Sequence, residues 1–254
     1  GTKNLSLMNL PPAQVEAVFL THFHSDHIDG LGELMLQRWA GGAHASPLPV
    51  YGHAGVDQVV GGFMAAYALD RGYRIAHHGP KVVPPTGFGG VPHAFDAAPG
   101  GVVVLNDRGL KVTAFPVRHD PAHPAVGYRF DYRGRSVVIS GDTAPSPELE
   151  AAARGADVLV HEGLAPNLVA VQRKAALEGG KANLAAIMHD ILSYHSAPEA
   201  VAAIAQRDQV RYLLFTHIIP PLPVRALEGP WLGRSREIFG GPIRVGHDGD
   251  FLSL

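Results

Sequence analysis

Apolar positions in this chain fall into two patterns, short continuous runs and stripes with helical spacing. A short apolar run bounded by Gly, Pro, Asn or Asp is typical of a buried strand. Apolar residues three and four positions apart, as at Leu31, Leu34 and Met35, are typical of a helix. The runs predict strands over 17–20, 49–52, 102–106, 110–117, 125–132, 135–139, 157–160, 210–215, 243–245 and 251–254.

Helical spacing marks a second set of segments between these strands. Gly179-Gly180 breaks the longest of them, and Ser196-Ala197-Pro198-Glu199 is typical of a capping box at a helix start. The Gly/Pro-rich stretch 72–101 predicts an irregular region with a short strand or two. The stripes predict helices over 31–39, 56–69, 147–154, 166–194 and 198–207, and a short helix or turn near Pro11-Pro12.

Strands and helices therefore alternate, which predicts an α/β fold. Side chains suited to metal binding or catalysis repeatedly follow the carboxyl end of a predicted strand, where α/β folds place their sites. These side chains are His22, His119, Asp142, His161 and His217.

Composition narrows the picture. The chain has 254 residues, 46% hydrophobic and 17% charged, which is enough to bury the core of a single domain over 1–254. Its formal charge of −2 gives no overall positive field for a large RNA. No apolar run approaches the roughly 18 residues of a membrane span, so we expect a soluble domain.

The lack of Cys limits the possible metal ligands, and the first residues of the chain bear on its compartment. With no Cys but fifteen His, any metal site must use His, Asp or Glu. The chain begins at Gly1-Thr2 without Met or a signal peptide. The compartment therefore stays open, an export signal included.

The densest candidate chemistry lies in the segment Thr21–His27, with the spacing H-x-H-x-D-H. His22 and His24 project to the same side of an extended segment, because side chains alternate there. Asp26 and His27 lie beyond the bend and face a second position. Mixed imidazole and carboxylate ligands suit zinc, with manganese or iron as alternatives, and fit two adjacent ions better than one.

This motif resembles that of the metallo-β-lactamase superfamily, and the rest of the chain resembles its branch of ribonuclease Z, the tRNA 3′-processing endonuclease, and related phosphodiesterases. The resemblance implies an αββα four-layer sandwich whose first strands would precede Gly1. It implies two metal positions and a carboxylate that bridges them. The residues that match are His22, His24 and His119 for one ion, Asp26, His27 and His217 for the second, and Asp142 for the bridge.

The chemistry of single residues agrees with this assignment. His119 and His217 end apolar runs, and Asp142 lies in a Gly-Asp-Thr turn where a buried carboxylate is costly unless cations neutralise it. Two such ions can hold a bridging water as hydroxide near neutral pH, which then attacks the substrate. Asp26 is a candidate to orient that nucleophile as well as to bind metal.

Two further loops match the ribonuclease Z branch. Val160-His161-Glu162-Gly163 resembles its HEAT loop, and Tyr194-His195-Ser196-Ala197 resembles its HST loop. The resemblance implies that Glu162 and His195 form a pair that assists protonation of the leaving oxygen. A His held by a carboxylate can stay protonated near pH 7 and act as a general acid. Gly163 and Ala197 differ from the residues of the HEAT and HST motifs, and these differences affect the expected shape of the two loops.

The expected size of the substrate depends on whether the chain has an arm that binds tRNA. The bacterial tRNA-processing enzymes usually insert a basic arm between the positions of His119 and Asp142, whereas 22 residues separate them here. Phosphate contacts would be few, so we expect small phosphodiesters, or another anionic ester such as an aryl sulfate, as substrates, with nucleic acid less favoured but still open. Candidate leaving-group contacts are Phe23, Trp39, Phe63 and Ile218.

Other functions stay open at this point. The missing Cys ligand argues against a class B1 β-lactamase, and His24 replaces the acid of flavodiiron enzymes. Ribonuclease Z activity, lactone or carboxylic ester hydrolysis, and a non-catalytic metal-binding module remain alternatives, although a binding module should have lost ligands. The oligomeric state is also open, with a homodimer as one candidate.

Overall fold

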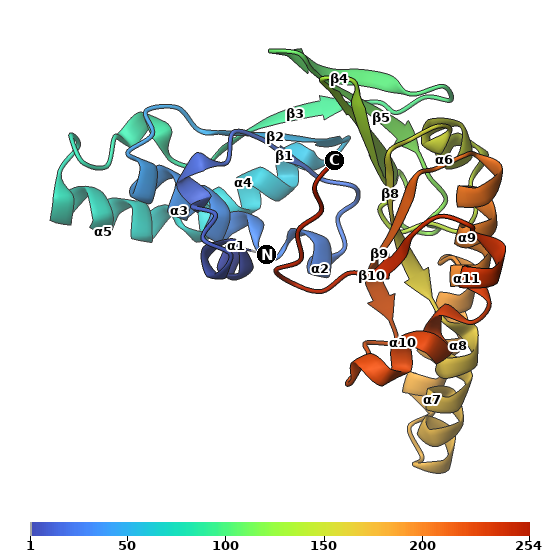
Figure 1. Ribbon diagram of the computed structural model, residues 1–254. Helices are drawn as coiled ribbons and strands as arrows, with labels where there is room; N and C mark the ends of the chain where they lie inside the picture. Colours follow the sequence, from blue (N-terminus) through green and yellow to red (C-terminus); the bar gives the residue numbers. More distant parts are fainter. Residues whose placement is uncertain (1) are drawn as a thin grey trace. The chain divides into compact units, whose positions relative to one another are not determined.

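The computed structural model describes residues 2–254. The chain divides into two compact units, one ending at Asp96 and one beginning at Ala97. Each unit has its own β-sheet with helices packed on it, as the ribbon in Figure 1 shows. The α/β class predicted from the sequence is confirmed, and the single domain over 1–254 stays a prediction.

The first unit contains a three-stranded parallel sheet in the order β1-β2-β3. Its core is formed where Met35 and Val60 from two helices meet Val50 of the central strand. Because successive strand residues face opposite sides, these contacts place both helices on one face of the sheet. The elements are α1 (Thr2–Leu7), η1 (Pro12–Gln14), β1 (Val18–Phe19), α2 (Ser25–Ile28), α3 (Leu31–Gly42), β2 (Leu48–His53), α4 (Val56–Ala66), α5 (Ala68–His78), η2 (Pro85–Gly87) and β3 (Gly90–Phe95).

The second unit contains a seven-stranded mixed sheet in the order β10-β9-β8-β7-β6-β5-β4. Strands β7 to β10 are parallel and β4 to β7 antiparallel, so the carboxyl ends of β7, β8 and β9 meet at one edge. The strands are β4 (Val102–Asp107), β5 (Leu110–Pro116), β6 (Val126–Tyr132), β7 (Arg135–Ile139), β8 (Val158–Leu164), β9 (Tyr212–Ile219) and β10 (Ile243–Val245).

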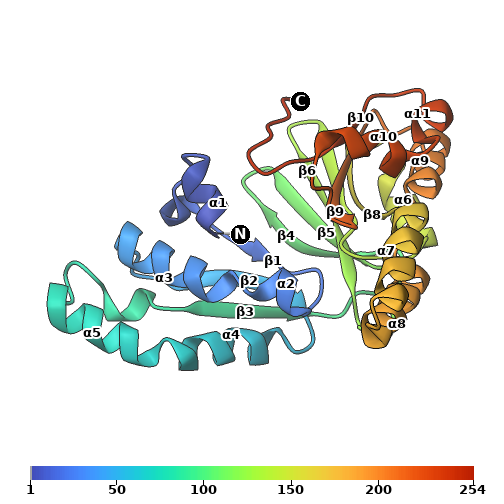
Figure 2. The ribbon, with the colours of Figure 1, turned by 90° about the horizontal axis from the view of Figure 1, so that it is seen from below.

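Helices α6, α9 and α11 cover one face of this sheet (Figures 1 and 2). Leu149 of α6 and Val201 of α9 pack there against Leu159 and Leu213 of the central strands. The remaining elements are α6 (Pro147–Ala153), α7 (Pro166–Glu178), α8 (Ala182–Asp190), η3 (Ile191–Ser193), α9 (Pro198–Arg207), η4 (Arg225–Leu227), α10 (Glu228–Leu232) and α11 (Ser235–Ile238).

Most predicted elements are present, but three predictions about segments are wrong. Residues 72–78 belong to helix α5, which Asp70 and Arg74 stabilise through an i,i+4 pair at 2.6 Å; the chain leaves the helix only at Gly79, with φ +79°. His161-Glu162-Gly163 is not an exit loop, because β8 continues to Leu164 alongside β9. Residues 251–254 form no strand.

The predicted capping box is also wrong. Helix α9 begins at Pro198, its N-cap is Ala197, and no side chain caps it. The Ser196 hydroxyl bonds elsewhere, and Glu199 accepts a hydrogen bond from the backbone N–H of Arg234. Among residues 2–254, no helix is long and apolar enough to cross a membrane.

Candidate metal and proton-transfer site

The H-x-H-x-D-H segment brings its four side chains together within the first unit. It follows β1, and the chain turns at His24 into the short helix α2. His22 Nε2 lies 3.0 Å from His24 Nδ1, and the rings of His22 and His27 are centred 4.1 Å apart. Asp26 Oδ2 lies 3.3 Å from His27 Nε2. Three imidazoles and a carboxylate so close together are side chains of the kind that bind a cation.

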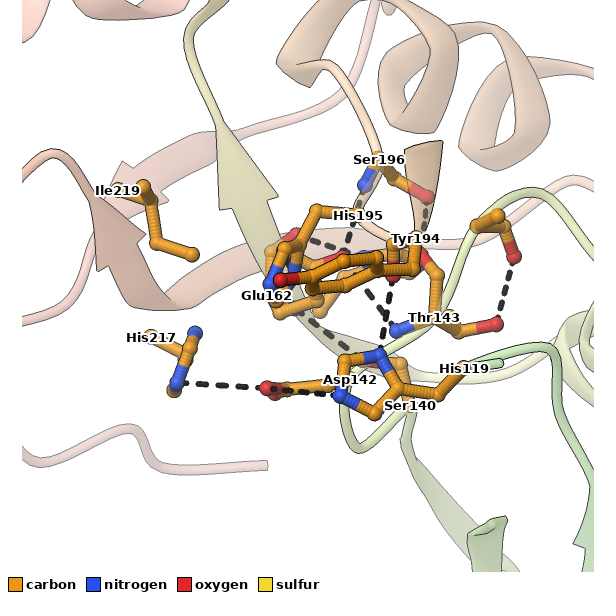
Figure 3. A network of polar contacts seen from close by, with 12 residues as sticks. His119, Ser140, Asp142, Thr143, Glu162, Tyr194, His195, Ser196, His217 and Ile219 are labelled. Atoms are coloured by element: carbon orange, nitrogen blue, oxygen red, sulfur yellow. Dashed lines mark hydrogen bonds and ion pairs between the residues drawn. The ribbon is translucent and has the colours of Figure 1, made fainter. Parts of the chain in front are cut away.

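In the second unit, two imidazoles converge on the Asp142 carboxylate, as the close-up in Figure 3 shows. Asp142 Oδ2 lies 3.4 Å from His217 Nε2 and 4.0 Å from His119 Nε2. Nδ1 of His119 lies 3.1 Å from the Tyr194 carbonyl and donates to it, which leaves Nε2 as the lone-pair atom facing Asp142. A buried carboxylate between two such nitrogens is a ligand set for a divalent cation.

A β-bulge aims His217 at this point. Glu162 of β8 pairs with Thr216 and Gly163 pairs with Ile218, so His217 is the extra residue on β9. Its φ of +46° lies in the left-handed region, which is strained for a residue with a side chain. Bulges re-aim side chains near functional sites, and this one turns the imidazole to Asp142.

Glu162 and His195 form a buried pair beside Asp142. Glu162 is 1% exposed, and its Oε2 lies 3.3 Å from His195 Nδ1. Its Oε1 accepts from the backbone N–H groups of Ser196 at 2.8 Å and Thr143 at 3.4 Å. Burial raises the pKa of Glu162 well above its usual value, and the Asp142 charge adds to this, against the lowering effect of the Ser196 hydrogen bond.

His161 is a further buried group in the same strand. It is fully buried, with Nδ1 2.7 Å from the Glu162 carbonyl oxygen. Burial lowers the pKa of His161 to about 4, so the ring is neutral at physiological pH. The apolar run predicts that His161 follows the end of a strand, whereas the structure places it inside β8.

Gly163 differs from the residue of the HEAT motif, and the packing of Trp231 against it explains the difference. A Cβ at this position would lie 2.5 Å from the ring of Trp231, which is 1% exposed in the core of the unit. Trp231 in turn donates through Nε1 to the Ile219 carbonyl at 2.9 Å. The departure at Gly163 thus leaves Glu162 in place within β8.

The four candidate leaving-group contacts differ in their surroundings. Phe23 is half-buried, and its ring lies 4.0 Å from that of His53 between centres, at a tilt of 35°. Phe63 packs against the core of the first unit. Trp39 is 1% exposed and donates to the Pro84 carbonyl at 2.6 Å, which indicates a packing role. Ile218 is half-buried against the core of the second unit.

The sequence singles out Ser196 as a helix cap and as a member of the loop that resembles HST, and Thr143 only as part of a turn. Both bond the Glu162 carboxylate through their backbone N–H groups. Their position beside His195 and Asp142 was a signal that could have found them. The residue type does not predict such a contact, because every residue except Pro has a backbone N–H that can donate.

The ligand atoms of the second unit are close enough to hold an ion. One atom each from His119, Asp142 and His195 lies within 4.8 Å of the others, and the same holds for Glu162, His195 and His217. Imidazole nitrogens and carboxylate oxygens suit zinc, so the residues present fit the metal that the sequence predicts.

Comparison with known proteins decides the family. The family model described as "Beta-lactamase superfamily domain" matches residues 4–218. The chain belongs to the metallo-β-lactamase superfamily. This membership confirms the predicted fold family and the prediction of a metal-dependent hydrolase.

Individual relatives place the chain near ribonuclease Z within the superfamily. It is 35% identical over 239 residues to "Ribonuclease Z" of Mycobacterium avium, covering 93% of this chain and 78% of that protein. The metallo-β-lactamase fold protein YhfI from Bacillus subtilis superposes with a TM-score of 0.61 at 19% identity, covering 96% of this chain and 80% of that one. The human short-form tRNase Z gives 0.57 at 21% identity, covering 84% and 76%.

Proposed function

We propose that this superfamily member is a dinuclear zinc hydrolase of small phosphodiesters, with aryl sulfates or other anionic esters as further substrates. The observation that carries the proposal is the convergence of His119 and His217 on Asp142, beside the buried Glu162–His195 pair. A bare metal-binding module needs the first arrangement and has no use for the second.

The family pattern assigns His22, His24 and His119 to one ion, with Asp26, His27 and His217 for the other and Asp142 bridging. When bound, two zinc ions activate a water molecule and stabilise negative charge on the phosphoryl oxygens. Manganese or iron would use the same ligands.

The protein's own residues supply orientation and a proton. The Tyr194 carbonyl fixes the His119 ring, so that Nε2 is held toward the ion. Glu162 Oε2 lies 3.3 Å from His195 Nδ1, and the buried pair retains one proton because burial raises the pKa of the carboxyl. His195 then gives a proton to the leaving oxygen, and Asp26 orients the attacking water.

Small substrates are favoured by the interval between His119 and Asp142. The β6–β7 hairpin fills it, with a turn at Arg133-Gly134, and leaves no room in the sequence for an arm that binds tRNA. A chain with a formal charge of −2 also gains little from counterion release.

Ribonuclease Z activity is the second candidate function. The 35% identity to a protein named ribonuclease Z, over 78% of its length, favours it. Hydrolysis of a lactone or carboxylic ester would use the same ligands, and so remains a third outcome of the test.

The test compares four substrates on one sample of known metal content. We expect hydrolysis of bis(p-nitrophenyl) phosphate, with two zinc ions per chain, and weaker turnover of an aryl sulfate. Turnover confined to a precursor tRNA would instead support ribonuclease Z activity, and turnover confined to a lactone would support the third outcome. No turnover and no bound metal would overturn the enzyme proposal.

A further inference from the structure

The segment Tyr194–Ser196 connects several parts of the candidate site. The Tyr194 carbonyl accepts from Nδ1 of His119, and the His195 ring faces Glu162 (Figure 3). The backbone N–H of Ser196 donates to Glu162 Oε1, and its carbonyl accepts from the Leu164 N–H at 2.9 Å. Three consecutive residues thus contact the His119 loop and strand β8.

The side chain of Ser196 adds a contact to a third part of the site. Its hydroxyl donates to the Thr143 carbonyl at 2.6 Å, and both residues are fully buried. Thr143 directly follows Asp142, and its own hydroxyl accepts from the Arg118 N–H at 3.0 Å while donating to the Ala144 carbonyl. The hydroxyl of Ser196 therefore ties the loop of His195 to the turn that presents Asp142.

Helix capping does not explain this serine. Helix α9 has Ala197 as its N-cap, and no side chain bonds its first N–H groups. A hydroxyl that is fully buried must find an acceptor, and its acceptor lies 53 positions away in the sequence. The contact spans two loops that carry different functional groups.

We infer that Ser196 is a positioning residue for the reaction, which holds the His195–Glu162 pair at a fixed place beside Asp142. This inference rests on the proposed function. Ser196 is fully buried, so it would act through His195 and Glu162 and not on the substrate itself. Without its hydroxyl, the Thr143 carbonyl loses its buried donor and the His195 loop gains freedom relative to the Asp142 turn.

The test compares Ser196→Ala with Ser193→Ala, whose hydroxyl is exposed and donates locally to the Asp190 carbonyl at 2.8 Å. In Ser196→Ala we expect kcat for bis(p-nitrophenyl) phosphate to fall roughly tenfold or more, with KM and metal content nearly unchanged. Ser193→Ala should match the wild type. Ser196→Thr keeps the hydroxyl and should recover most of the lost kcat.

Amide hydrogen exchange gives a readout that needs no activity. The N–H groups of residue 196 and Thr143 both donate to Glu162, and we expect their exchange to become at least tenfold faster in Ser196→Ala and unchanged in Ser193→Ala. Wild-type kcat with unchanged exchange in Ser196→Ala would overturn the inference. Equal loss of kcat in folded Ser196→Ala and Ser196→Thr would also overturn it. A wild type without turnover would refute the proposed function alone, and the exchange result would still decide whether Ser196 holds the site together.

Discussion

The carboxylate of Glu162 faces the imidazole of His195 at 3.3 Å, in surroundings that leave Glu162 1% exposed. The other carboxylate oxygen is held by two backbone N–H groups, so the contact with His195 has one fixed direction. Burial raises the pKa of the Glu162 carboxyl well above its usual value, so this carboxyl keeps its proton more readily than an exposed one. The pair is therefore built to keep a proton between its two members.

If this proton goes to the leaving oxygen, the effect of removing it should depend on the leaving group. A stable anion such as p-nitrophenolate needs little protonation, whereas an alkoxide needs it strongly. We expect His195→Ala and Glu162→Gln to lower kcat/KM for an alkyl phosphodiester by roughly 10²- to 10⁴-fold, and for bis(p-nitrophenyl) phosphate much less. Steady-state kinetics on both substrates measures this difference.

A matched control for this prediction is His189→Ala, because His189 is an exposed His in α8. It should leave both substrates unaffected. An equal loss on both substrates in His195→Ala would point to a changed metal site and would contradict a role in leaving-group protonation.

The bridging role proposed for Asp142 leads to a prediction about metal content. Replacing its carboxylate by an amide removes the negative charge between His119 and His217 while keeping the shape of the side chain. Asp142→Asn should retain fewer than two zinc ions after dialysis, as measured by elemental analysis, and lose diesterase activity. Asp131→Asn is the control, since Asp131 pairs with Arg129 in β6 and should keep wild-type metal content. Full zinc content in Asp142→Asn would rule out the bridge.

The sequence predicted the strands of the second unit well because their apolar runs are bounded by turn residues, such as Asp107-Arg108-Gly109. It failed over residues 72–78, where Gly72 and the nearby glycines and prolines suggested irregular chain. The Asp70–Arg74 pair and the packing of Ile75 against the core hold that helix together. The i,i+4 pair is local and can be read from the sequence, whereas the packing of Ile75 depends on the tertiary structure.

Candidate site residues were predicted more readily than their placement. The spacing of the His22 motif predicted a cluster, and the Gly-Asp-Thr turn predicted the position of Asp142. The strand that contains Glu162 and the bulge at His217 were not predicted, because both depend on the register between β8 and β9. Register is set by pairing across the sheet and cannot be derived from one strand alone.

The buried ring of His161 should make the stability of the metal-free protein depend on pH. Its pKa is about 4 in the folded chain against 6.5 in the unfolded chain, so between these values the unfolded state binds the extra proton. Stability from this group is therefore full above pH 6.5 and falls as pH drops toward 4, by about 3 kcal/mol in all.

The raised pKa of Glu162 acts in the opposite direction, so a variant is needed to isolate His161. His161→Asn can keep a donor near the Glu162 carbonyl but cannot titrate. Urea unfolding at pH 7.5 and pH 5 should show a larger loss at low pH in the wild type than in His161→Asn. Equal losses would mean that the unfolding of this chain is not linked to a neutral His161.

Strain at His217 gives a prediction in which stability and function separate. Its φ of +46° is costly for His and free for Gly, so His217→Gly removes about 1 kcal/mol of backbone strain. This gain offsets two losses, the packing of the imidazole and the greater entropy of Gly in the unfolded state. We expect the metal-free variant to unfold within about 1 kcal/mol of the wild type in urea. The same variant should lose metal and activity, because the imidazole facing Asp142 is gone.

Gln209→Gly is the matched comparison, since Gln209 is exposed and has a φ of +56° outside the site. It should change stability by a similar small amount and retain full metal content and activity. If His217→Gly instead destabilised the metal-free protein by several kcal/mol, the packing of the imidazole in the folded protein would explain why the chain keeps the bulge. With both variants near wild-type stability, the strained backbone is retained because it presents His217 to Asp142.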